Sequence, residues 1–119
     1  MPASMSDLLL PLTRLAELLE RLGHPRAAEV RAQVALVHAA PDVIPRALDS
    51  NAWWAGAGSL AAATMADNPG LPEAVWRMEV REFRVLLIEI GEQLLARGLA
   101  NPGISSWVQA FSHWNQSEV

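Results

Sequence analysis

The chain has 119 residues, of which 51% are hydrophobic and 18% charged, and its formal net charge is −4 at pH 7. This length predicts a single domain over residues 1–119, which the segments below indicate is helical, and the acidic balance argues against nucleic acid, whose phosphates select a basic surface. Lysine and cysteine are both absent, which excludes P-loop and Schiff-base lysines, thiol nucleophiles and cysteine-bound metal centres.

Two amphipathic helices are expected first in the chain. Leucines between residues 6 and 22 recur at alternating spacings of four and three, which places them on one helical face. Gly23 then ends the helix. The next helix spans residues 25–40, with Pro25 at the favoured first position and Pro41 as its stop. The short Gly-His-Pro connection predicts an antiparallel hairpin.

Further helical segments follow. Residues 42–50 are expected to form one or two helical turns. Residues 72–97 form the longest helix, which begins with Pro72, ends at Gly98 and carries on one face Trp76, Val80, Phe83, Leu87, Ile90 and Leu94. The last helix begins near Pro102. Because no strand pattern appears, we predict an all-α fold, a compact helical bundle of four main helices plus short helical pieces around a long central helix at 72–97.

The segment NAWWAGAGSLAAA, residues 51–63, carries the G-x-G pattern of some phosphate-binding loops and a serine that suggests a hydrolase nucleophile. Both functions need a preceding strand, and no strand is expected. We interpret the segment as a structural corner. Gly56 and Gly58 permit backbone conformations or close approaches that other residues do not, and Ser59 caps the following turn.

The segment resembles the centre of a family of small uncharacterised bacterial proteins, which reads aromatic-G-G-M-G-S-(L/F)-x-D-L. The corresponding residues here run from Trp54 to Leu60. Ala55 replaces the first glycine of that pattern, and Ala62 replaces its aspartate. The resemblance supports a helical fold and implies no activity, because the family has none established. The arginine-only, alanine-rich composition also points to a bacterial source.

Five tryptophans accompany the absence of tyrosine. Trp76 and Trp107 lie on apolar stripes and are expected in the core. The adjacent Trp53 and Trp54 cannot point the same way, so we expect one to pack inward and the other to be partly exposed. Trp114, near the chain end, is expected to be the most exposed. Exposed tryptophan is a common contact in protein interfaces.

An arginine stripe, Arg77, Arg81 and Arg84, runs beside the apolar face of the central helix. Three aligned guanidinium groups could clamp a carboxylate or phosphate. Alternatively, their stems pack on apolar neighbours while the charged ends stay in water.

The remaining polar residues suggest no metal site. Acids on the central helix could bind a metal, but bundle sites usually add a histidine in Glu-x-x-His, which is missing. Alternation with arginine favours a solvated face instead. The residues concerned are the acids Glu79, Glu82, Glu89 and Glu92, and the histidines His24, His38 and His113.

We therefore expect a non-enzymatic, cytoplasmic protein-interaction module that binds another protein, without cofactor, metal, nucleic acid or membrane; a toxin-neutralising immunity protein is one example. The alternative is a small-ligand-binding helical domain with an apolar pocket lined by Trp53 or Trp54 and closed by an arginine. A buried Glu79 or Glu89 facing a cleft would favour an enzyme. A homodimer is expected if Trp114 and the last helix expose an apolar face.

Overall fold

The computed structural model describes residues 6–40, 44–55, 59–65, 72–98 and 102–116. Their regular elements are all helical and no strand occurs among them, which confirms the predicted all-α bundle. The elements are α1 (Ser6–Arg21), α2 (Ala27–Ala39), α3 (Ile44–Leu48), α4 (Asn51–Trp54), the 3₁₀ turn η2 (Ala62–Met65), α5 (Glu73–Ala96) and α6 (Pro102–Gln116).

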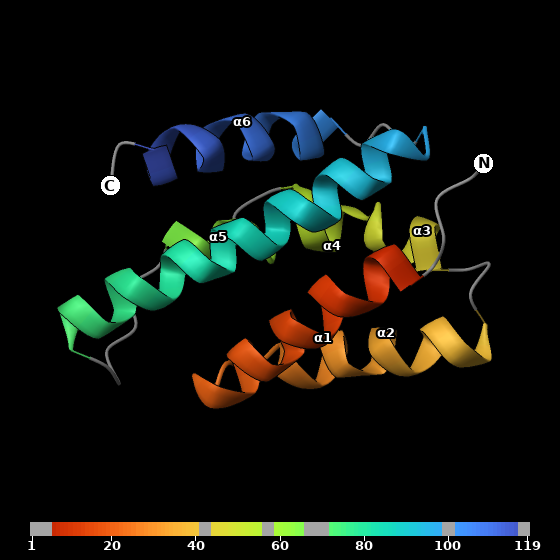
Figure 1. The fold of residues 1–119 in the computed structure, drawn as a ribbon, viewed down its shortest axis with the longest axis horizontal. Helices are drawn as coiled ribbons and strands as arrows, with labels where there is room; N and C mark the ends of the chain where they lie inside the picture. Colours follow the sequence, from red (N-terminus) through yellow and green to blue (C-terminus); the bar gives the residue numbers. More distant parts are fainter. Residues whose placement is uncertain (1–5, 41–43, 56–58, 66–71, 99–101, 117–119) are drawn as a thin grey trace.

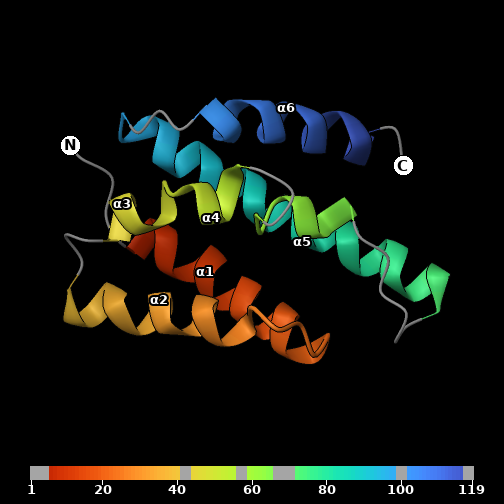
Figure 2. The ribbon, with the colours of Figure 1, turned by 180° about the vertical axis from the view of Figure 1, so that it is seen from behind.

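The long helices lie in the order α2, α1, α5, α6 across the bundle (Figure 1). α5 packs against α1 on one side and α6 on the other, which confirms the predicted central helix. The short helix α4 also contacts α6, and η2 contacts α5. Figure 2, from the opposite side, shows α4 in front of α5, and α3 contacts α2. Among the described helices, none combines the length and hydropathy needed to cross a membrane.

The hairpin of α1 and α2 forms as predicted. Gly23 has a φ of +66°, in the left-handed region that favours glycine. Its N–H donates to the carbonyl oxygen of Glu20 at 3.1 Å, and the N–H of His24 donates to that of Leu19 at 2.8 Å. These bonds satisfy the last carbonyl groups of α1 in a Schellman motif.

The beginning of α2 differs from the prediction, because the helix starts at Ala27 and Pro25 lies in the turn before it. The reason is His24. Its carbonyl oxygen accepts the N–H of Ala27 at 3.1 Å, and its Nδ1 accepts the N–H of Arg26, also at 3.1 Å. These two bonds close a tight turn and delay the α-helical pattern by two residues.

The other predicted boundaries agree closely with the structure. α5 begins one residue after Pro72 and ends before Gly98, whose φ is +82°. α3 lies within the expected turns at residues 42–50, and α6 begins at Pro102.

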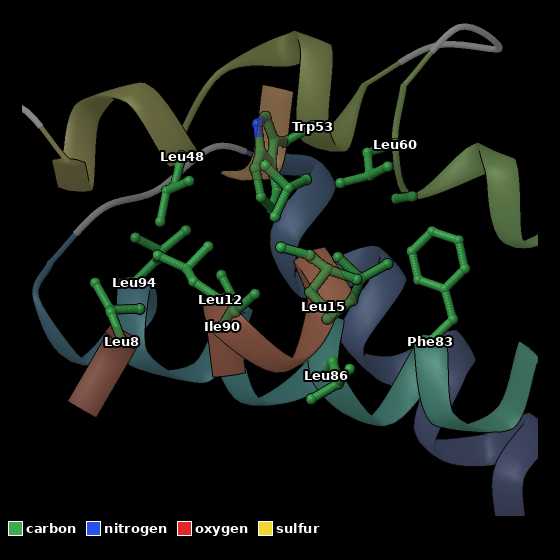
Figure 3. Packing of buried hydrophobic residues seen from close by; sticks show 14 of the residues in the cluster. Leu8, Leu12, Leu15, Leu48, Trp53, Leu60, Phe83, Leu86, Ile90 and Leu94 are labelled. Atoms are coloured by element: carbon green, nitrogen blue, oxygen red, sulfur yellow. The ribbon is translucent and has the colours of Figure 1, made fainter. Parts of the chain in front are cut away.

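The core lies where α1, α5 and the short elements α3, α4 and η2 with their connections, here called the middle segment, meet (Figure 3). Each element contributes side chains that are almost fully buried. They are Leu8, Leu12 and Leu15 of α1, Leu48, Trp53 and Leu60 of the middle segment, and Phe83, Leu86, Ile90 and Leu94 of α5. Burying one such side chain stabilises the fold by about 1.5–3 kcal/mol. The predicted leucine stripe of the first helix and the apolar face of the central helix therefore meet each other.

Candidate functional site

Both tryptophans of α4 are buried, so the expectation that one is partly exposed is wrong. Trp53 is 2% exposed and Trp54 is fully buried. Figure 3 shows Trp53 within the leucine cluster. Trp54 instead contacts α5 and α6. A Cβ atom added at Gly91 of α5 would lie 3.3 Å from Cη2 of Trp54, and one added at Gly103 of α6 would lie 3.0 Å from its Cβ. Packed elements therefore bury both indoles, and the exposed residues of α4 are Asn51 and Ala52.

The polar groups of Trp54 already have partners inside the protein. Its Nε1–H donates to the carbonyl oxygen of Leu48 at 2.6 Å. Its own carbonyl oxygen accepts the Nε1–H of Trp107 at 2.8 Å. These bonds join α3, α4 and α6, so Trp54 is a structural junction.

Ser59 has the predicted capping role. It is 3% exposed, and its Oγ accepts the N–H of Ala62 at 3.1 Å at the start of η2. A buried hydroxyl that caps a turn is poorly placed to attack a substrate. Gly56 and Gly58, the glycines of the predicted corner, lie outside the described residues. Of the described members of the resembling motif, Trp54, Ser59 and Leu60 are buried and Ala55 is exposed.

The arginine stripe separates into two parts. Arg77 is exposed and pairs with Glu73 at 2.8 Å, the i, i+4 arrangement that stabilises exposed helices. Arg81 donates to the carbonyl oxygen of Asn115 at 2.9 Å, and Nη1 of Arg84 donates to Oδ1 of Asn115 at 3.5 Å. Two of the three arginines therefore hold the C-terminal end of α6 against α5.

Arg84 is 8% exposed, and its guanidinium carbon lies 5.2 Å from the ring centroid of Trp114, a cation–π contact. Burial, followed by the nearby charge of Arg81, lowers the pKa of Arg84 from its usual value. The contact also corrects the expectation for Trp114, which is half-buried. Trp76 and Trp107, expected in the core, are only partly buried at its edge.

The structure does not bring the tryptophan pair and the arginine stripe together. Trp54 meets α6 at Gly103, whereas Arg81 and Arg84 meet it at Asn115. These positions are separated by 12 residues of one helix, a distance of about 18 Å. A single pocket lined by Trp54 and closed by one of these arginines does not fit this arrangement.

A homodimer is expected only if Trp114 and the last helix expose an apolar face, and the structure does not show such a face in the residues it describes. Trp114 is half-buried, and from residue 103 to residue 116 of α6 the exposed residues are polar: Ser105, Ser106, Gln109, His113 and Gln116. An apolar contact between two copies therefore has no basis on the exposed side of this helix.

The acids of the central helix lie on a solvated face, as predicted, with one exception. Glu82, Glu89 and Glu92 are exposed. Glu79 is partly buried and pairs with Arg21 at 2.7 Å, which joins α5 to α1. Among the described residues, no cluster of three or more acids or histidines has the geometry to hold a metal ion.

His24 is a half-buried histidine between the hairpin and the central helix. Its ring meets Phe83 edge-on at 6.3 Å between centroids. Burial, with a smaller contribution from the charge of Arg26, lowers the pKa of His24. Burial disfavours the charged imidazolium, so the unfolded chain binds a proton at a higher pH than the folded one does.

This difference predicts a pH-dependent stability. The contribution of neutral His24 to the free energy of unfolding is fully present above the ordinary histidine pKa of about 6.5. It is lost as the pH falls towards the lower pKa of His24 in the folded protein. Urea denaturation at about pH 7.5 and pH 5.5 should show a smaller acid-induced loss for His24→Gln than for the parent protein. His113→Gln, at an exposed position, should keep the full loss. Equal losses in all three proteins would contradict the role of His24.

A surface that the sequence prediction missed lies on α5. Met78, Glu82, Val85, Glu89 and Glu92 follow one another at spacings of four and three residues, and we call this stripe the α5 outer face. All five are exposed, with Met78 at 74% and Val85 at 41%. The same spacing that revealed the buried stripe could have revealed this second one, but only the packed structure shows which stripe remains uncovered.

No family profile, curated protein or solved structure matches the chain. The arguments about function therefore depend on the surface and contacts of this chain alone.

Proposed function

We propose that the chain is a non-enzymatic protein-interaction module that binds its partner through the α5 outer face. The main support is Met78, a large apolar side chain that is 74% exposed on the central helix. Val85 lies two turns further along the same stripe and is 41% exposed. Apolar side chains grouped among polar ones are typical of interaction surfaces, and methionine adapts well to a partner.

The contacts of the polar side chains considered for catalysis, metal binding or anion binding favour a protein-interaction role over chemistry. Ser59 caps η2, His24 closes the turn before α2, and Arg81 holds the end of α6. Each group therefore contributes to the fold through a bond that a catalytic role would have to break. The same argument weakens the ligand-pocket alternative, because both polar groups of Trp54 are engaged inside the protein.

A specific form of this proposal is a cytoplasmic immunity protein that neutralises a toxin by covering its surface. Such a protein needs a stable scaffold and an exposed complementary face, without catalytic groups. The net charge of −4 suits a partner that is basic, as toxins acting on nucleic acids are. If the partner is a toxin, coexpression of the chain should restore the growth of cells that produce it.

The binding proposal is tested by isolating the tagged full chain from its native cells and rebuilding any complex from purified components. We expect one protein partner in a defined stoichiometry by light scattering. Met78→Ser, which removes the apolar contact without adding charge, should weaken the complex about tenfold or more, which corresponds to the loss of about 1.4 kcal/mol of contact energy. Gln109→Ser, on the exposed side of α6, should have little effect. Recovery of the chain without a protein partner under all growth conditions would contradict the proposal.

A further inference from the structure

The carboxylates of the α5 outer face differ from most of the other glutamates that the structure describes. Glu20, Glu29, Glu73 and Glu79 each form an ion pair with an arginine. Glu82, Glu89 and Glu92 form no ion pair with another described residue. The stripe from Met78 to Glu92 is about 21 Å long at 1.5 Å per residue. It therefore presents three uncompensated negative charges on one uncovered helix face.

This arrangement does not benefit the isolated fold. Glu89 and Glu92 are three residues apart on one helix face, where like charges repel and destabilise a helix by a few tenths of a kcal/mol. Met78 and Val85 on the same stripe are also left in water. Repulsion and exposed apolar area would both be relieved by a partner that supplies positive charge and apolar contact together.

The charge pattern also selects between possible partners. A two-fold contact between copies of this chain through the α5 outer face would bring the carboxylates of Glu82, Glu89 and Glu92 against the same set, without an intervening base. Anionic membranes and nucleic acids would be repelled for the same reason. A basic protein surface satisfies both features, because lysine or arginine can meet the carboxylates while apolar residues cover Met78 and Val85.

We infer that the α5 outer face is the docking site for a basic protein surface, in which Glu82, Glu89 and Glu92 receive lysine or arginine and Met78 and Val85 form the apolar contacts. This inference rests on the proposed function and adds the chemistry of the partner and the face it covers. Exposed charges act mainly on the rate of association, so complex formation accelerates at low ionic strength.

One experiment locates the cation-binding surface with a defined probe. The ¹⁵N-labelled full chain is titrated with hexalysine at low ionic strength and followed by NMR. Chemical-shift changes should concentrate at residues 82–92 and disappear in Glu89→Gln/Glu92→Gln, but persist in Glu17→Gln, which removes an exposed carboxylate from α1. Shift changes centred on another helix, or unchanged in the double variant, would overturn the docking site.

A second experiment identifies the partner and separates this inference from the proposed function. A photo-crosslinking amino acid at Val85 should capture a basic protein in native cells, whereas the same group at Gln109 should not. The captured protein, once purified, should bind Glu89→Gln/Glu92→Gln at least tenfold more weakly than the parent chain, and Glu17→Gln almost normally. Its affinity for the parent chain should also fall as salt is added.

The outcomes distinguish the two claims. A purified complex whose affinity is insensitive to the double variant and to salt would overturn the docking site while leaving the interaction function standing. The absence of any protein complex from crosslinking and isolation together would overturn both. Circular dichroism of each variant checks that the exposed substitutions leave the fold intact.

Discussion

Gly103→Ala is expected to lower the free energy of unfolding by about 2–3 kcal/mol, although alanine normally favours a helix over glycine. A Cβ at this position would overlap the carbonyl oxygen of Trp54 and lie 2.9 Å from its carbonyl carbon. The obstacle is backbone, which cannot rotate away as a side chain can. The first turn of α6 would therefore have to move away from α4 and break the close contact between them.

Chemical denaturation followed by circular dichroism measures this effect, and the chain provides a matched control. Gly98→Ala makes the same substitution at a position where no atom lies within 4 Å of the added Cβ. The backbone at Gly98 has a φ of +82°. Its cost should be limited to the strain of a left-handed backbone, about 1–2 kcal/mol. The shift in the near-ultraviolet signal of the tryptophans should be larger for Gly103→Ala. A Gly103→Ala protein as stable as the parent would show that α4 and α6 are not in close contact.

Trp54→Ala is expected to have the largest effect of any single substitution considered, about 3–5 kcal/mol of lost stability. Trp54 is the largest fully buried side chain, and its removal leaves a cavity between α4, α5 and α6. Domains of this size are stable by about 5–15 kcal/mol in total. Trp54→Ala should therefore leave a substantial fraction of the molecules unfolded. Urea titrations of this variant should begin at low temperature or in a stabilising osmolyte.

Trp54→Phe separates the packing of the ring from its hydrogen bond. Phenylalanine keeps most of the apolar contact but removes the donor at 2.6 Å from the carbonyl oxygen of Leu48. Leaving that buried acceptor without its partner should cost about 1–3 kcal/mol. Trp76→Ala, at a partly buried position, should cost less than Trp54→Ala. Equal losses at the two positions would contradict the junction role of Trp54.

Local signals in the sequence were enough to predict the helices and most of their ends. Gly23 and Gly98 both adopt the left-handed conformation that ends a helix, and Pro72 immediately precedes the longest helix. The exception is the beginning of α2, where the side chain of His24 forms a turn that no periodicity rule includes. One backbone and one side-chain hydrogen bond accepted by His24 accompany a helix that begins two residues later than expected.

The exposure of side chains was harder to predict than the helices. Trp53 and Trp54 are both buried, because burial depends on which elements cover a four-residue helix. That is a property of the whole bundle and not of the local pattern. Met78 and Val85 show the reverse case. Their stripe is visible in the sequence, but its exposure follows from the packing of α1 and α6 on the other sides of α5.

The position of α1 between α2 and α5 also has a kinetic consequence. Two adjacent residues in its last turn form ion pairs of very different range, since Glu20 reaches Arg31 across 11 residues and Arg21 reaches Glu79 across 58. Closing a short loop costs less chain entropy than closing a long one. The hairpin of α1 and α2 should therefore form early in folding. The packing of α5 against this hairpin should be slower and should limit the folding rate.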